Sequence, residues 1–232
     1  MKSCLDVALS HRSIRKYKPE PVPEDDIRRI LEAARRHPSS WNLQPVTVIV
    51  VRDGGAKERL SKILWDQPHI REAPVFMIFA VDFMKVRRAV ELAGGEAIEP
   101  SYGNLLTGLI SASMALAWAA AAAESLGYGV AFIAVYGKPC EVADALGLPR
   151  YVLPIAGLLV GKPDEDPELR PRQPLEALAG FEGYGDVSER AKLYLQTSSD
   201  FPGLLVKVMG KGGFYDAINK GVGECLKRQG LI

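Results

Sequence analysis

Residues 11–51 read HRSIRKYKPEPVPEDDIRRILEAARRHPSSWNLQPVTVIVV, and this stretch decides the fold because two polar clusters flank one helix and lead into a strand. Three consecutive acids suit the first turn of a helix, and apolar residues then recur at helical spacing. The sequence therefore predicts a helix from about residue 24 to 36. Residues 47–51 are nearly all β-branched, which predicts a strand buried on both faces.

The first polar cluster carries two guanidinium groups and a hydroxyl within four residues. Arg12 and Arg15 would share a face if the segment begins a helical turn, and Ser13 adds a short donor. Guanidinium presents a rigid fork of donors that matches phosphate oxygens. The cluster therefore indicates a site for phosphate or another anion, although a solvated helix start has the same composition.

The second polar cluster is a turn dense in hydrogen-bonding side chains. It contains Ser39, Ser40, Asn42 and Gln44, with Trp41 as a flat apolar surface. Such a turn can bind the polar edge of a planar heterocycle. A structural turn without a ligand is the alternative.

Composition is that of an ordinary soluble globular protein. The 232 residues are 47% hydrophobic and 25% charged, with a net charge of +1, which argues against a broad nucleic-acid interface. Cys4, Cys140 and Cys225 lie far apart, without a zinc motif or a dense disulfide framework, and so suggest a reducing compartment. Residues 1–10 lack the apolar region of a signal peptide. We therefore expect a cytoplasmic protein.

One segment, residues 105–123, is uncharged for a length that could cross a bilayer. It is rich in alanine and lacks basic flanks, so it is interpreted as a helix buried all round in a soluble core.

The rest of the chain alternates strands and helices. Strands are predicted at 74–81, 129–136 and 153–160, and short helices at 57–64 and 141–146. Residues 83–102 look irregular and could form a lid, and residues 189–232 hold two helical patterns. No glycine-rich nucleotide loop has the required spacing.

The two clusters, in this order, resemble the amino-terminal signature of the FMN-dependent nitroreductase family: Arg-Ser-x-Arg, then Pro-Val-Pro, then Pro-Ser-Ser-x-Asn-x-Gln-Pro. The segments at 123–129 (AESLGYG), 146–149 (LGLP), 157–163 (GLLVGKP) and 170–175 (RPRQPL) follow in the order of the flavin reductase and NADPH-type oxygen-insensitive nitroreductase branch. The resemblance covers almost the whole chain.

The resemblance implies an α+β homodimer whose central mixed or antiparallel sheet is flanked by helices. The long apolar helix would lie at the subunit interface. Residues 1–232 would form a single domain, with a possible lid insertion at 83–102 and a C-terminal helical extension at 189–232. Neither nucleic acid nor membrane is implied as a partner.

The resemblance also implies FMN as cofactor, bound where the arginine cluster of one subunit meets the Ser/Asn turn of the other. Arg12, Arg170 and Arg172 would bind the phosphate, and Arg15 would face the N1/O2 edge of the ring. The implied FMN-binding residues are His11, Arg12, Ser13, Arg15, Ser39, Ser40, Asn42, Gln67, Phe132, Ile133, Arg170 and Arg172. Phe132 and Ile133 would lie along the ring, partly through backbone groups.

The implied activity is a ping-pong, two-electron reduction of nitroaromatics, quinones or related electron-poor acceptors by NADPH or NADH. Flavin N5 would carry the hydride, so no side chain is expected to act as a catalytic acid or base. The choice of donor stays open, because residues 197–202, which would lie near a 2'-phosphate, contain no arginine. The alternatives are enone reduction, dehalogenation, flavin consumption, or a non-catalytic flavin-binding dimer.

Overall fold

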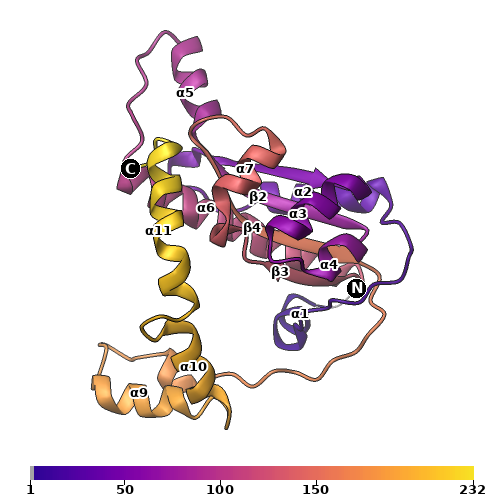
Figure 1. The fold of residues 1–232 in the computed structure, drawn as a ribbon, viewed down its shortest axis with the longest axis vertical. Coiled ribbons are helices and arrows are strands. Elements are labelled where there is room, and N and C mark those ends of the chain that lie inside the picture. Colours follow the sequence, from indigo (N-terminus) through magenta and orange to yellow (C-terminus); the bar gives the residue numbers. More distant parts are fainter. Residues whose placement is uncertain (1–2) are drawn as a thin grey trace. The chain divides into compact units, whose positions relative to one another are not determined.

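The computed structural model describes residues 3–232, so Met1 and Lys2 lie outside the described residues. The chain divides into two compact units, which are described separately (Figure 1). Of the described residues, the first unit contains 3–167 and 221–232, and the second contains 168–220. Whether the whole chain acts as one domain stays a prediction.

A four-stranded antiparallel sheet forms the centre of the first unit. The strands are β1 (Val46–Val51), β2 (Val75–Asp82), β3 (Gly129–Ile133) and β4 (Val152–Gly161), in the order β1-β2-β4-β3. Every residue of β2 is buried, as its apolar sequence predicts. β1 packs on both faces as predicted, because Val46, Val48 and Val50 contact one apolar cluster while Ile49 and Val51 contact the other, but most of its residues are only partly buried. The predicted third strand is shorter than expected, since residues 135–137 form a 3-10 turn.

Helices cover both faces of this sheet. α2 (Glu24–Arg35) and α6 (Tyr102–Ser125) pack with the sheet in one apolar cluster. α3 (Gly54–Ile63), α4 (Pro68–Glu72) and α7 (Pro139–Leu146) contribute to the cluster on the other face. The short α1 (Cys4–Ser10) lies against α6.

The long helix α6 is not buried all round within one chain, contrary to the prediction. Four large apolar residues spaced four apart on it are between 39% and 61% exposed: Leu106, Ile110, Met114 and Trp118. We call these four residues the α6 stripe. Among the described residues, α6 is the one helix that is long and apolar enough to cross a membrane, and 44% of its most apolar window is buried inside the chain.

The segment 83–102 is more regular than the sequence indicated. Residues Phe83–Leu92 form a helix, α5, whose first turn is capped by Asp82 accepting a hydrogen bond from the Lys85 amide at 3.0 Å. Only residues 93–101 lack regular structure. A lid role for this segment stays a prediction.

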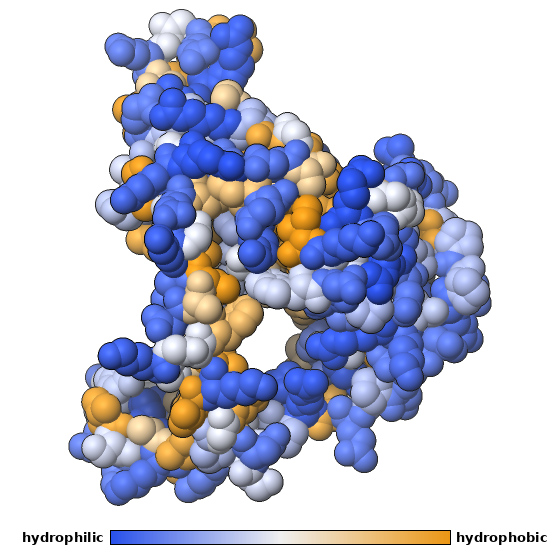
Figure 2. Space-filling model, in the orientation of Figure 1, coloured by the Kyte–Doolittle hydropathy of each residue, from blue (hydrophilic) through white to orange (hydrophobic). Residues whose placement is uncertain are grey.

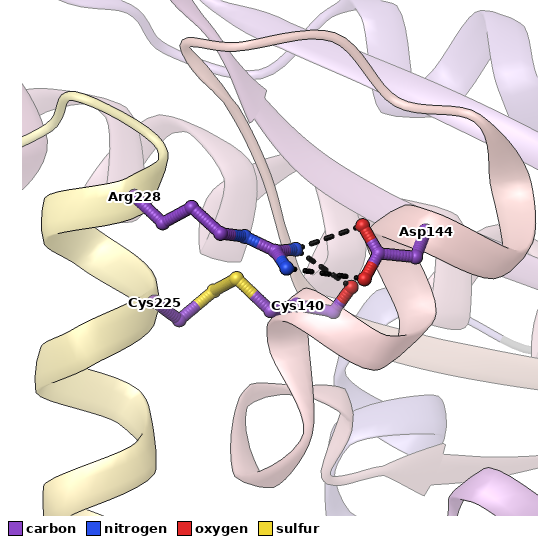
Figure 3. The surroundings of a disulfide bond; sticks show 4 residues. All are labelled: Cys140, Asp144, Cys225 and Arg228. Carbon is purple, nitrogen blue, oxygen red and sulfur yellow. Dashed lines mark hydrogen bonds and ion pairs between the residues drawn. A yellow bond between two sulfur atoms is a disulfide. The ribbon is translucent and has the colours of Figure 1, made fainter.

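A disulfide joins Cys140 of α7 to Cys225 of α11 (Phe214–Arg228), as Figure 3 shows. Beside it, the Arg228 guanidinium donates to both carboxylate oxygens of Asp144, at 2.8 and 3.1 Å. Sequence spacing did not predict this pairing, because 85 residues separate the two cysteines. The bond also weakens the argument from cysteine usage for a reducing compartment.

The second unit is helical and has little core. Its elements are α8 (Leu175–Leu178), α9 (Val187–Leu195), α10 (Phe201–Met209) and the first turns of α11. The tail therefore contains three helices where two helical patterns were expected. Among residues 168–220 only Ala177 is buried, and Figure 2 shows hydrophobic side chains on the surface over α9 and α10.

Candidate functional site

The arginine cluster lies in an extended segment, so the condition under which Arg12 and Arg15 would share a face, a helical turn, is not met. Ser13 forms a parallel bridge with Val130 of β3, and the Ile14 amide donates to the Val130 carbonyl at 2.8 Å. Side chains alternate along extended chain, so residues three apart point to opposite sides. Arg12 and Arg15 therefore do not share a face.

Arg12 is held by groups that a phosphate could replace. Its guanidinium donates to an Asp166 carboxylate oxygen at 2.7 Å and to the Pro167 carbonyl at 2.9 Å. The Asp166 side chain is 86% exposed, and an ion pair at such a site contributes little to stability. An anion that reached Arg12 would therefore displace a weakly held partner.

Acidic groups also fix the backbone beyond Arg12. The Arg15 and Lys16 amides both donate to one carboxylate oxygen of Glu165, at 2.5 and 3.1 Å. The Arg15 side chain is exposed and forms no ion pair within residues 3–232. Its charge is therefore available to a ligand.

His11 and Phe132 form an aromatic corner beside the arginine cluster. The rings meet edge to face with centroids 5.7 Å apart, and His11 Nδ1 lies 2.9 Å from a Glu124 carboxylate oxygen. Phe132 is 42% exposed although Ala131 and Ile133 on either side of it are buried. It thus presents a flat apolar surface at this edge of the sheet.

Ile133, by contrast, cannot offer its side chain to a ligand. It belongs to the buried cluster on the face of the sheet that also holds Phe76, because neighbouring strand residues point to opposite faces. Only its backbone groups can contact a ligand on the other side of the strand.

A small cavity of about 160 Å³ lies beside Arg12, between the C-terminal end of α6 and the acidic segment at 165–166. Gly127 and Gly129 contribute to its lining. Close approach of the chain requires glycine at 129, because a Cβ there would lie 2.8 Å from three side-chain atoms of Ile14.

We expect Gly129→Ala to displace the segment that carries the arginine cluster. Overpacking of this kind costs about 1–3 kcal/mol of folding free energy, measured by denaturant unfolding. Gly54→Ala is the matched control, since a Cβ at Gly54 meets nothing within 4 Å. Equal stability of the two variants would contradict the requirement for glycine at position 129.

Gln67 lies close to the arginine cluster, but its amide is already engaged. The side chain donates to the Leu64 carbonyl at 2.8 Å. Leu64 and Ile70, on either side of Gln67, lie in the same buried cluster as Ile14, the neighbour of Arg15. In the same turn, burial and then the positive charge of Arg15 lower the pKa of His69.

The Ser/Asn turn is closed by its own hydrogen bonds. The Ser39 hydroxyl accepts from the Gln44 amide at 2.9 Å, and the Asn42 side-chain oxygen accepts from the Gln44 side chain at 2.8 Å. Trp41, Asn42 and Gln44 all have positive φ, between 49° and 53°, which is uncommon outside glycine. Trp41 is 98% exposed and Ser40 is exposed as well. The turn thus holds unfavourable backbone angles while presenting an aromatic ring to solvent.

One chain does not bring the two polar clusters together. The Ser/Asn turn leads into β1, whereas the arginine cluster lies along β3, and these strands are the two opposite edges of the sheet. Three strand spacings, or roughly 14 Å, separate the edge strands β1 and β3. His11, Arg12, Ser13, Arg15 and Phe132 form one group, with Gln67 near it, and Ser39, Ser40 and Asn42 form another.

Arg170 and Arg172 belong to the second unit. The Arg172 guanidinium donates to the carbonyls of Arg170 and Pro171, at 3.2 and 3.3 Å. Both arginines line a cavity within residues 168–220. Neither forms an ion pair with an acid in the described part of the chain.

Sequence reasoning missed the acids that hold the arginine cluster, namely Glu124, Glu165 and Asp166. Charge pattern could have found two of them, because the run Asp164-Glu165-Asp166 directly follows the GLLVGKP segment and could compensate a basic cluster elsewhere.

Comparisons of the sequence and of the structure with known proteins match this chain to the same family. The nitroreductase family matches residues 8–162. The chain is 41% identical over 187 residues to FMN reductase [NAD(P)H] of Bacillus subtilis, covering 79% of this chain and 75% of that protein. It is 32% identical over 194 residues to the oxygen-insensitive NADPH nitroreductase of Salmonella typhimurium, covering 82% and 78%.

Among solved structures, NfrA2 of B. megaterium superposes with a TM-score of 0.86 at 32% identity, covering 99% of this chain and 98% of that one. A family match over more than half of the chain, with relatives above 30% identity, confirms the resemblance found in the sequence. This chain belongs to the nitroreductase family.

Proposed function

We propose that this protein is an FMN-dependent NAD(P)H oxidoreductase that reduces electron-poor acceptors such as nitroaromatics and quinones. Relatives named for FMN reduction and for NADPH-dependent nitroreduction support this activity. When bound, FMN supplies the two-electron chemistry, and the protein binds, orients and tunes it.

The observation that carries this proposal is the group beside β3. Within four residues of sequence it offers two cations, which point to opposite sides of the extended segment, and a hydroxyl, beside the strand that carries the exposed ring of Phe132. A phosphorylated, flat, apolar ring system needs that combination of partners. The residues present therefore fit FMN, with Arg12 exchanging Asp166 for the phosphate.

Arg15 would act electrostatically and not as an acid or base. Its guanidinium is exposed and forms no ion pair among residues 3–232. A fixed cation stabilises negative charge that develops on a neighbouring ring. Arg170 and Arg172 remain our proposed further phosphate ligands, and Gln67 and the Ile133 backbone our proposed ring contacts.

We also propose a homodimer in which the α6 stripe is the interface. Four large apolar residues on one face of a helix form a patch that a monomer would leave in water. A two-fold pair would bury this patch against its own copy. It would also let the Ser/Asn turn of one subunit, with Ser39, Ser40 and Asn42, complete the site of the other.

A charge placed in the α6 stripe tests the dimer. We expect Met114→Asp to convert the dimer to monomer, because pairing would bury an unpaired carboxylate. Light scattering after size-exclusion chromatography measures the mass. Leu92→Asp is the matched control, since Leu92 is an exposed apolar residue on α5. A wild-type monomer, or a Met114→Asp variant that stays dimeric, would contradict the proposal.

The visible spectrum of the purified protein tests the activity. We expect flavin absorption that bleaches on anaerobic addition of NADH or NADPH and returns on addition of a quinone or nitroaromatic. Steady turnover without loss of FMN separates a reductase from a flavin-consuming enzyme. A protein that binds FMN but is not reduced by either donor would be the non-catalytic flavin-binding dimer.

We further propose that the protein is soluble and works in the cytoplasm, without membrane or nucleic acid as partner. A net charge of +1 argues against nucleic acid as a partner. The Cys140–Cys225 disulfide is the observation that speaks against a reducing compartment, since disulfides are rare there.

A further inference from the structure

Another cavity of the first unit, of about 210 Å³, lies beside the Ser/Asn turn, whose Gln44 lines it. Its apolar lining residues come from α2, β1 and α6: Leu31, Ala34, Val46, Val48 and Ala115. The other lining residues are polar: Arg35, His37, Gln44 and Lys85. An apolar cavity of roughly 150 Å³ holds one benzene ring. This cavity can therefore hold a single ring with a small substituent.

His37 gives the cavity a hydrogen-bond acceptor. The residue is 9% exposed, and its Nδ1 lies 2.9 Å from the Ala34 carbonyl oxygen. A carbonyl can only accept, so Nδ1 carries the proton, and Nε2 of the neutral ring is then an acceptor. Within residues 3–232, this Nε2 is the one buried side-chain nitrogen or oxygen that has no hydrogen-bond partner. Such atoms are rare and cost folding free energy, which favours a ligand that donates a hydrogen bond here.

Lys85 adds a donor to the same cavity. Its Nζ donates to the Val46 carbonyl oxygen and, at 3.4 Å, to the Thr47 hydroxyl. An ammonium group has three N–H donors, so one remains for a ligand oxygen. Arg35 does not require an anionic ligand, because its guanidinium is already paired with Glu32 and is 63% exposed. The polar groups therefore suit a neutral hydroxyl, which can both donate and accept.

We propose that this cavity is a binding site for single-ring phenols, and that it takes the hydroquinone formed when a quinone gains two electrons and two protons. The choice of hydroquinone rests on the proposed function. A phenol ring fits the apolar walls, and its O–H can donate to Nε2 of His37. A quinone has only carbonyl oxygens and cannot donate. A site built to bind a hydroxyl rejects the analogue that lacks it, so the cavity would distinguish product from substrate.

The proposed phenol site is separate from the flavin-binding group beside β3. Two of its walls, Val46 and Val48, belong to β1, which is the opposite edge of the sheet. Gln44 connects the cavity to the Ser/Asn turn, because its side chain donates to the Asn42 side-chain oxygen at 2.8 Å. A bound phenol would therefore contact the turn that we propose to complete the partner's site.

Calorimetry on the FMN-loaded, full-length protein compares 4-methylphenol with 4-fluorotoluene, which has nearly the same shape and no O–H. We expect 4-methylphenol to bind about tenfold more tightly, as one hydrogen bond to an otherwise unpartnered atom predicts. Hydroquinone should bind like 4-methylphenol. His37→Phe keeps a flat ring and removes the acceptor, so it should bring 4-methylphenol to the affinity of 4-fluorotoluene. His69→Asn is the matched control, because His69 lies in α4 and does not line the cavity.

Val48→Phe tests the cavity independently of the hydrogen bond. The larger side chain should fill the cavity from β1 and abolish binding of both ligands, while the melting temperature and FMN content show that the variant is folded. Nitrogen-15 NMR of the wild type gives a readout that needs no altered binding site. The Nε2 resonance of His37, identified by its absence in His37→Phe, should shift with 4-methylphenol and not with 4-fluorotoluene.

The outcomes separate this inference from the proposed function. If 4-methylphenol binds no more tightly than 4-fluorotoluene, or if His37→Phe leaves its affinity unchanged, the inference is overturned while the oxidoreductase stands. Binding that alters the flavin absorption and persists in His37→Phe would place the phenol at the flavin, with the same result. If neither NADH nor NADPH reduces the flavin, the proposed function fails and hydroquinone falls as the ligand, while selective binding of 4-methylphenol would still support the phenol site.

Discussion

Replacing Arg12 with alanine will release FMN. Charge-assisted hydrogen bonds to phosphate contribute about 1.5–3 kcal/mol, so the dissociation constant should rise by roughly 10- to 100-fold. The effect is large because Asp166, now 2.7 Å from Arg12, would be left as an unpaired negative charge near the phosphate. Titration of the apoprotein with FMN, followed by flavin fluorescence, measures the change.

Asp166→Asn is the matched control for this variant. It removes the carboxylate that competes for Arg12 and leaves the Pro167 carbonyl in place. FMN binding should therefore be unchanged or a few-fold tighter. Arg172→Ala should weaken binding like Arg12→Ala. If FMN binds both alanine variants with wild-type affinity, the phosphate assignment is wrong.

Removing the disulfide will strongly destabilise the first unit. Cys140 and Cys225 close a loop of 85 residues, and the chain-entropy estimate for that length is about 4.5 kcal/mol. The variant with both cysteines replaced by serine should therefore lose several kcal/mol of unfolding free energy. For a chain of this size the melting temperature should fall by roughly 10 °C or more.

Cys4→Ser is the control, because Cys4 is exposed and unpaired. Its melting temperature should match that of the wild type, while a reducing agent that reaches the disulfide should lower the wild type to the level of the double variant. A double variant as stable as the wild type would show that the Arg228–Asp144 ion pair and the packing of Cys225 suffice to hold α11.

Sequence periodicity predicted the elements that are organised by local pattern. β2 is apolar throughout, and α2 combines an acidic first turn with helical apolar spacing, so both lie where expected. The family resemblance, carried by motif order, predicted the fold class that the structural neighbours confirm.

Features that depend on distant neighbours were not predictable. β1 has the same β-branched composition as a central strand, and only sheet order makes it an edge. The sequence left open whether the arginine cluster begins a helical turn, and pairing of Ser13 with Val130 makes the segment extended. The acidic run marks Asp166 as a candidate counter-charge, but its pairing with Arg12 could not be predicted because 154 residues separate the two. The roles proposed for the individual FMN-binding residues stay predictions.

The link between α7 and α11 has a topological consequence. Residues 141–224, including the whole thinly packed second unit, lie inside one covalent ring. A single protease cut anywhere in that span would leave both fragments tied through sulfur, so a nicked molecule would migrate as one band on a non-reducing gel and as two after reduction. Proteolytic cleavage within the second unit would therefore leave α11 covalently attached to the first unit.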